Sequence, residues 1–362
     1  MTKQRFVSVL VVVSALFAAF FYSSFFINFA ATLSDYSGFG VTWPHQLFYN
    51  FLHGRAFQDS IFAVNGSDVG YVGNPYAFIH MNAMHVHLTP FLFACIWALH
   101  PTLSSLYSLI FVWNIAGGLF FTWLIIKKLS PDDYRIKAAV ATAVLLGSGS
   151  LSVLKAMAQP LLFAGPFCLA AYYCLLDKRR FLFFLNVVLL CMVSEDAAMV
   201  AAAFGAYIWF FEPESRSYAR DCLAFSVPYL LLVLFVVQPA ARAELIVSDG
   251  STTLAIVKYM FHMSMPILWD NVKSMTPIFT LLPAFFISGS LFGLPEARRL
   301  RAVAAMALLP AFPHWGQCLV VGGGHHTHTP FVFLYLALLL MIAWAPSAGT
   351  VWSLRRVSAA TA

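Results

Sequence analysis

The chain has 362 residues, of which 61% are hydrophobic and 10% are charged, and its formal net charge is +6. Soluble domains carry about a quarter charged residues, so this composition excludes an ordinary soluble protein and indicates a polytopic membrane protein. The surplus of basic residues follows the loops between apolar segments, as orientation in a membrane requires, and gives no support to nucleic-acid binding.

Apolar stretches follow one another along the whole chain. A membrane-spanning helix needs roughly 20 mostly apolar residues, and some of the middle stretches are shorter. The ten predicted spans are 6–31, 104–126, 138–154, 160–176, 181–193, 197–211, 222–237, 276–294, 302–321 and 331–345. The first is longer than the apolar core of a signal peptide, which predicts an uncleaved anchor. The sequence therefore predicts an all-α integral membrane protein, with residues 1–362 forming one transmembrane bundle of about ten helices.

The basic residues predict the orientation of these spans. Loops on the cytoplasmic side of membrane proteins carry an excess of lysine and arginine. With the N-terminus inside, 16 of the 21 basic residues fall in inside segments and five fall outside. The inside segments are "MTKQR", "KKLSPDDYRIK", "DKRR", "EPESRSYARD", "PEARRLR" and "SLRR". Both termini are therefore predicted to be cytoplasmic.

Two predicted outer loops are long, whereas the inside loops are short, which excludes a large cytoplasmic activity. The first outer loop, 32–103, begins with a turn-rich, aromatic segment and is predicted to contain interfacial helices. The second, 238–275, includes "LAIVKYMFHMSMPILWDNVKSM", whose aromatic residues suit the headgroup boundary of a membrane.

None of the 11 histidines faces the predicted cytoplasmic side: ten lie in outer segments, and His314 lies in the outer half of its span. "HVHLTP" holds His85 and His87, and "HHTHTP" holds His325, His326 and His328. Histidine binds phosphate, transfers protons and ligates metals, so these segments predict one outward-facing site at the edge of the bilayer. They are predicted to approach each other, because buried imidazoles need polar partners. A polar hairpin with hydrated imidazoles is the alternative interpretation.

A divalent metal is one further alternative for the histidines. His-rich tracts bind transition metals, and His87, His326 and His328 are the candidate ligands. Neither segment has the helical HExxH spacing of zinc proteases, so no cofactor is assigned from the sequence.

"VSEDAAM" places Glu195 and Asp196 at a short predicted outer turn. Ser194 is expected to cap the next helix, with both acids in its first turn, where the helix dipole favours negative charge. A functional interpretation stands beside this one, because acids at the membrane edge cost solvation unless they are paired. Lys155, in the short outer segment "KAMAQP", either extends to lipid headgroups or holds a lipid phosphate.

Four stretches resemble a family of predicted bacterial and archaeal membrane proteins of unknown function, which are themselves similar to GT-C glycosyltransferases. The stretches are "GVTWPHQLFYNFLHGR" (40–55), "HVHLTPFLF" (85–93), "SEDAAM" (194–199) and "HHTHTPFVFLYLA" (325–337). The resemblance implies a GT-C-like fold with a long first outer loop, in a bacterial cytoplasmic (inner) membrane. It also implies a polyprenyl-phosphate-linked sugar as donor and an acid in the first outer loop as base or metal ligand.

Under this resemblance the candidate residues fall into two sets. The candidate acids are Asp35, Glu195 and Asp196, which would activate an acceptor hydroxyl. The candidate phosphate-binding or substrate-binding residues are Gln46, Arg55, His85, His87, Lys155, His325, His326 and His328. Membrane lipids and a polyprenyl-phosphate sugar are the expected partners.

The sequence departs from the family pattern at two positions. Gly40 stands where relatives have an Asp six residues before Gln46, and Ser194 stands where a Lys is expected. Asp35 is the nearest acid upstream of Gly40. A non-catalytic membrane subunit or lipid-binding component of a larger complex is therefore the main alternative function. A transporter is a weaker one, since no inverted repeat is found.

Overall fold

The structure is a computed structural model of the whole chain. The residues that it describes are 37–55, 58–59, 79–80, 86–129, 163–238, 269, 297–310, 312 and 328–344. These residues are helical apart from connecting turns and one short antiparallel ladder, in which β1 (Gln58–Asp59) pairs with β2 (Ile79–His80). The predicted all-α class is confirmed for this part of the chain.

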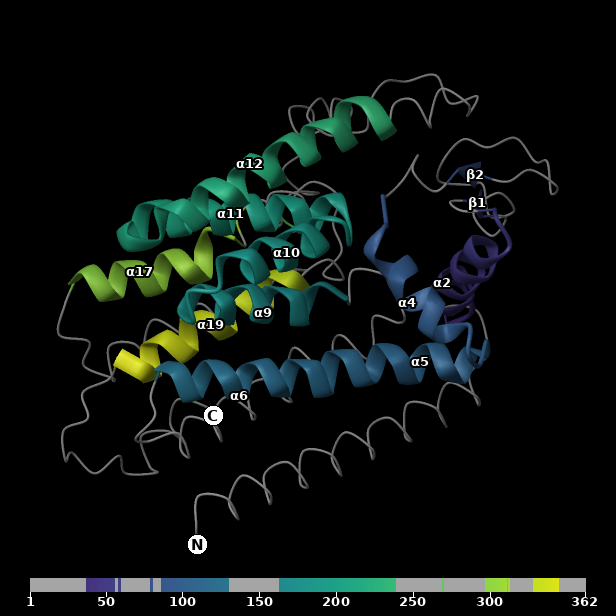
Figure 1. Cartoon of the computed structure of the whole chain (residues 1–362), viewed down its shortest axis with the longest axis horizontal. Helices are drawn as coiled ribbons and strands as arrows, with labels where there is room; N and C mark the ends of the chain where they lie inside the picture. The colour runs from purple at the N-terminus through teal and green to yellow at the C-terminus, as the bar shows by residue number, and fades with distance from the viewer. Residues whose placement is uncertain are drawn as a thin grey trace, which may run out of the picture.

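Four consecutive helices form the centre of the bundle: α9 (Ala164–Leu176), α10 (Arg180–Cys191), α11 (Glu195–Phe211) and α12 (Arg216–Leu232). Short turns join them, so neighbours run antiparallel, with α10 against α9 and α12 against α11. Two later helices, α17 (Ala297–Leu308) and α19 (His328–Trp344), pack against each other and against this group (Figure 1).

A close helix approach fixes α11 against α12. A Cβ atom added at Gly205 would lie 2.9 Å from Leu223 Cγ and 3.2 Å from Cys222 Sγ. Across this interface the Cys222 thiol donates to the carbonyl of Ala201. Phe204, the residue before Gly205, packs its ring against Phe333 of α19. The helix α11 is thus buried on several sides, which suits its almost uniformly apolar sequence.

A long continuous helical segment runs beside these helices. It consists of α5 (Leu103–Val112), the π-helical turn η2 (Trp113–Gly117) and α6 (Gly118–Leu129). The Trp113 indole donates to Phe163 O at 3.0 Å, which joins η2 to the start of α9. Beyond this point α5 projects past the bundle towards α2 (Ser37–Leu52) and α4 (Thr89–Trp97) (Figure 1). Both α2 and α4 lie within the predicted first outer loop.

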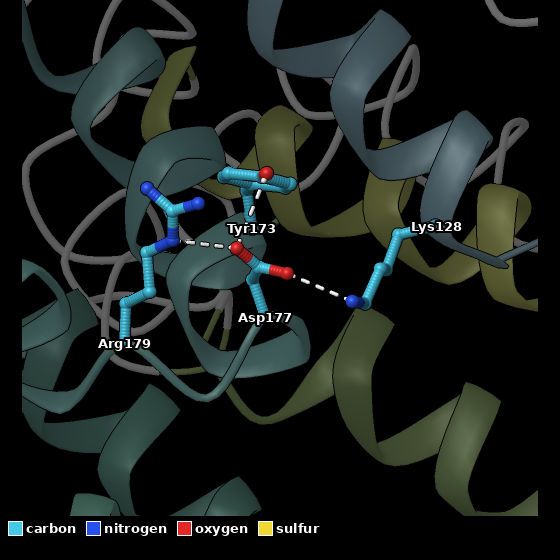
Figure 2. Close-up of polar contacts among 4 residues, drawn as sticks. All are labelled: Lys128, Tyr173, Asp177 and Arg179. Carbon is cyan, nitrogen blue, oxygen red and sulfur yellow. Dashed lines mark hydrogen bonds and ion pairs between the residues drawn. The ribbon is translucent and has the colours of Figure 1, made fainter.

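One end of the bundle gathers the loops that were predicted to face the cytoplasm. Lys128 Nζ lies 2.8 Å from Asp177 Oδ1, and Arg179 Nε lies 2.6 Å from Asp177 Oδ2 (Figure 2). Arg180 makes a bidentate ion pair with Asp221: Nε donates to Oδ2 at 2.5 Å and Nη2 donates to Oδ1 at 2.8 Å. We call this the basic end and define it by the residues 127–129, 177–180, 212–221 and 298–301.

The start of α17 belongs to the same end. Burial raises the pKa of Glu212, while a hydrogen bond from Tyr207 and the nearby charges of Lys178 and Arg298 act in the opposite direction. Arg299 lies over the ring of Trp344, the last residue of α19. Four of the six predicted inside segments therefore have described residues that meet at one end of the bundle.

The span predictions are tested only where the chain is described. Within those residues, one helix, Pro213–Val237 (25 residues), is long and apolar enough to cross a membrane; it comprises the 3-10 turn η5 (Pro213–Ser215), α12 and the π-helical turn η6 (Val233–Val237). The helices α9 and α10 are apolar but shorter. The predicted spans 6–31, 138–154 and 276–294 lie outside the described residues, as does 238–275 apart from Gln238 and Trp269. A count of ten spans stays a prediction.

Candidate functional site

The segment before α4 is hydrogen-bonded to the end of α10. The backbone N–H groups of Leu88 and Thr89 donate to the carbonyl of Met192, at 2.8 and 2.9 Å, and the Thr89 hydroxyl donates to Leu189 O at 2.6 Å. The last carbonyls of a helix have no partner within the helix, and residues 88 and 89 supply donors to two of them. Pro90 follows in the first turn of α4, where its missing N–H costs nothing.

His87 is held within this junction. Its side chain is 5% exposed, and its Nδ1 lies 2.6 Å from the carbonyl oxygen of Val193. A carbonyl only accepts a hydrogen bond, so Nδ1 carries the proton. In the neutral imidazole the lone pair is then on Nε2, which is the atom that accepts a proton or binds a metal.

Two buried carboxylates begin α11. Ser194 caps the helix with an extended backbone, and its hydroxyl accepts from Ala197 N at 3.2 Å, which confirms the predicted N-cap. Glu195 and Asp196 occupy the first turn and are 5% and 4% exposed. Glu195 Oε2 accepts a hydrogen bond from Val86 N at 3.2 Å. The stretches "HVHLTP" and "SEDAAM", 109 residues apart at this bond, therefore meet directly.

The junction contains buried ionisable side chains of the kinds that acid–base chemistry uses. Burying a carboxylate is costly unless it is hydrogen-bonded or paired, and the start of a helix stabilises negative charge. Glu195 accepts from Val86, the neighbour of His87 in the chain, and buried carboxylates and imidazoles of fixed tautomer are residue types that acid–base sites use. We call residues 86–89 together with 192–196 the 86–196 junction.

The start of α19 lies at the same end of the bundle as this junction. Val332, one turn into α19, lies 3.6 Å from the position of a Cβ at Gly165, near the start of α9. The other end of α19 reaches the basic end through Trp344. His328, the first residue of α19, is thus placed on the junction side.

Several predicted site residues lie outside the described residues: Asp35, His85, Lys155, His325 and His326. The predicted approach of His87 to His326 cannot be compared with the structure, because His326 is one of these residues, and it stays a prediction. Among the residues that the structure does describe, no group of three or more His, Cys, Asp or Glu side chains is arranged to hold a metal ion.

Gln46 and Arg55 come from α2 and the turn that follows it. Gln46 is partly buried within the helix. The helix ends at Leu52. In the turn that follows, Gly54 has a φ of 72°, the left-handed conformation that glycine accepts, and Arg55 N donates to Asn50 O at 2.8 Å. The Arg55 side chain is exposed, so it is not part of the buried junction.

Nearby, His45 meets the Trp97 ring edge-on, with ring centroids 5.0 Å apart. Burial lowers the pKa of His45 and so favours its neutral form. Both residues connect α2 to α4, the helix that begins at the junction.

The sequence did not predict that Thr89 and the carbonyls of Leu189, Met192 and Val193 form the hydrogen bonds of the 86–196 junction. The proline after Thr89 indicates the start of a helix, but nothing in the sequence indicates that the Thr89 hydroxyl bonds to Leu189 O. The carbonyls gave no indication either, because every residue has one.

These helices and their apolar surfaces define a helical membrane protein. A family model described as "Predicted membrane protein (DUF2079)" matches residues 35–312, and the chain belongs to this family. The matched range includes three of the four stretches on which the resemblance rests, and "HHTHTPFVFLYLA" lies beyond it. No curated protein matches the chain. No solved structure matches it either.

Proposed function

We propose that this protein is a GT-C-like glycosyltransferase that uses a polyprenyl-phosphate-linked sugar at the outer face of the bacterial inner membrane. Membership of a membrane-protein family supports the lipid environment. The observation that carries the proposal is the buried pair Glu195 and Asp196, joined by a hydrogen bond to the histidine-bearing 86–89 segment.

In this proposal one of the two carboxylates accepts the proton of the acceptor hydroxyl as the sugar is transferred. The Val86 N–H fixes the orientation of Glu195. His87 bonds to Val193 O through Nδ1 and has Nε2 as its basic atom when neutral, and the histidines of the segment that precedes α19 bind the donor phosphate.

The alternative is a non-catalytic membrane subunit of a larger complex. The observation that favours it is Gly40, which lies within α2 at the position where the family resemblance implies an acid. The buried acids of α11 would then serve structure alone.

The test is transfer of a radiolabelled sugar from polyprenyl phosphate by the full-length protein in liposomes, with a panel of lipid-linked sugars. Glu195→Gln and Asp196→Asn keep size and hydrogen-bonding capacity and remove the charge. We expect at least one of them to reduce the rate by about 10²–10⁴-fold, the usual loss for a general base. Asp35→Asn tests the other candidate acid in the same assay.

The matched control is Glu214→Gln, because Glu214 is an exposed acid at the basic end and its substitution is expected to leave the rate unchanged. Gel filtration of each variant checks that the fold is kept. No transfer by the wild type with any donor, or full activity in the Glu195→Gln/Asp196→Asn double variant and in Asp35→Asn, would support the non-catalytic alternative.

A further inference from the structure

Tyr229 of α12 adds one more polar group to the surroundings of the 86–196 junction. Arg216 begins α12 at the basic end, and Tyr229 comes roughly 20 Å further along the helix axis. The helix α12 packs against both α10 and α11. The Tyr229 hydroxyl lies within electrostatic range of the Glu195 carboxyl and of the Cys191 thiol at the end of α10. It therefore approaches the junction from a helix that supplies none of the junction's other residues.

The side chain of Tyr229 is turned towards the inside of the bundle. Its ring is partly exposed and stacks on Phe225, one turn earlier in α12, with ring centroids 5.7 Å apart, whereas its hydroxyl oxygen is buried. Among the residues that the structure describes, this oxygen has no hydrogen-bond partner. A buried tyrosine hydroxyl usually has one, because an unmade hydrogen bond is costly away from water. A polar ligand bound beside Glu195 would supply it.

The groups around this hydroxyl select the chemistry of the ligand. A carboxylate accepts several hydrogen bonds, so Glu195 can accept from a ligand as well as from Val86 N. A neutral hydroxyl group suits both neighbours, because its oxygen accepts from Tyr229 and its proton is donated to Glu195. A phosphate would be repelled by the carboxylates of Glu195 and Asp196. A cation would leave the phenol proton without an acceptor.

We propose that Tyr229 is a ligand-binding residue of the junction, whose hydroxyl donates a hydrogen bond to a ligand hydroxyl that Glu195 holds on its other side. The ligand class is a neutral compound rich in hydroxyl groups, as sugars are. That this ligand is the sugar acceptor rests on the proposed transferase function. Tyr229 then orients the acceptor hydroxyl towards the carboxylate that takes its proton, and the donor phosphate is bound elsewhere.

Thermal unfolding of the full-length protein in detergent tests whether the hydroxyl lacks a partner within the chain. Tyr229→Phe removes the hydroxyl alone and is expected to leave the melting temperature unchanged or to raise it, since no hydrogen bond of the protein is lost. Tyr207→Phe is the matched control, because the Tyr207 hydroxyl donates to Glu212 Oε1 at 3.3 Å, and it is expected to lower the melting temperature. An equal loss in both variants would show that the chain itself bonds the Tyr229 hydroxyl and would overturn the proposal.

Ligand-induced stabilisation tests the ligand class without requiring transfer. The probes are the methyl glycosides of glucose, galactose, mannose and N-acetylglucosamine, with inorganic phosphate for comparison. At least one glycoside is expected to raise the melting temperature of the wild type and to bind Tyr229→Phe about 2–10-fold more weakly, the range for loss of one hydrogen bond. Tyr207→Phe is expected to keep the wild-type affinity, and any phosphate binding is expected to be independent of Tyr229. No stabilisation of the wild type by any glycoside, or equal glycoside affinity in the wild type and Tyr229→Phe, would contradict the proposal.

The same variants separate this proposal from the transferase function. Glycoside binding that depends on Tyr229, in a wild type that transfers no sugar, would support the binding site and remove the function. Sugar transfer by the wild type, with the acceptor KM unchanged in Tyr229→Phe, would keep the function and overturn the role of Tyr229.

Discussion

The two ends of the bundle use carboxylates in opposite ways. At the basic end, Asp177 and Asp221 are partly exposed, and each is paired with a lysine or arginine that is itself exposed. At the other end, Glu195 and Asp196 are buried at the start of α11, and Glu195 accepts from a backbone N–H of the 86–89 segment. The carboxylates at the basic end are therefore screened by solvent, whereas those at the start of α11 are removed from it.

The two ends therefore differ in how much their polar contacts contribute to stability. Exposed ion pairs contribute about 0–1 kcal/mol each, so the ion pairs of the basic end add little stability. Buried polar groups cost about 1–3 kcal/mol when their partners are removed. The 86–196 junction is thus the place where substitutions of equal size have the larger consequences.

The largest expected difference concerns Glu195. Glu195→Ala leaves the Val86 N–H without its acceptor and is expected to lower the free energy of unfolding by about 1–3 kcal/mol. Glu195→Gln keeps an acceptor oxygen and is expected to remain close to the wild type. Thermal unfolding in detergent measures both, and Asp177→Ala at the basic end serves as the comparison, with a smaller expected loss because exposed ion pairs contribute little. An equal loss for Glu195→Ala and Asp177→Ala would remove the contrast between the two ends.

A smaller difference is expected between two helix-capping serines. Ser194 caps α11 through its hydroxyl, whereas Ser215, before α12, makes no capping hydrogen bond and instead accepts from Lys178 Nζ at 3.2 Å. Ser194→Ala is expected to cost about 1 kcal/mol, as loss of an N-cap usually does. Ser215→Ala is expected to cost clearly less in the same unfolding measurement. The reverse order would mean that the α11 cap does not stabilise the junction.

The smallest expected effect is a pH dependence at the basic end. A hydrogen bond from Lys128 is the largest cause that holds the pKa of Asp177 below its ordinary value; burial opposes it, and a hydrogen bond from Arg179 adds to the lowering. A depressed folded-state pKa contributes stability above the unfolded pKa and loses it as the pH falls through the folded value. The wild type is therefore expected to lose slightly more stability than Asp177→Asn on going from neutral pH to the acidic side of the ordinary Asp range. Identical pH profiles would show that the ion pair adds nothing.

Much of the bundle could be predicted from the sequence. The stretches 160–176, 181–193, 197–211 and 222–237 correspond to the four central helices, because uninterrupted apolar runs separated by short polar turns leave few alternatives. The N-cap at Ser194 followed from residue type and from the acids after it. The family membership followed from short motifs and is confirmed.

Other features could not be predicted, for physical reasons. The turn-rich segment "SGFGVTWP" begins the helix α2 despite two glycines and a proline, because the helix packs against α4 and tertiary contacts override weak local propensity. The junction of residues 86–89 with the end of α10 depends on backbone donors and acceptors. Every residue carries these groups, so no pattern of side chains indicates which of them will meet.

The central claim is that the 86–196 junction and the basic end lie on opposite sides of the membrane, with the junction outside. Cysteine accessibility in intact cells tests it directly, in a background where the exposed Cys95 is replaced by Ser. Arg55→Cys, beside the α2–α4 pair, and Arg220→Cys, at the basic end, both introduce a thiol at an exposed position. A membrane-impermeant maleimide is expected to label Arg55→Cys in intact cells and Arg220→Cys only after permeabilisation. Labelling of Arg220→Cys in intact cells, with Arg55→Cys protected, would contradict the account.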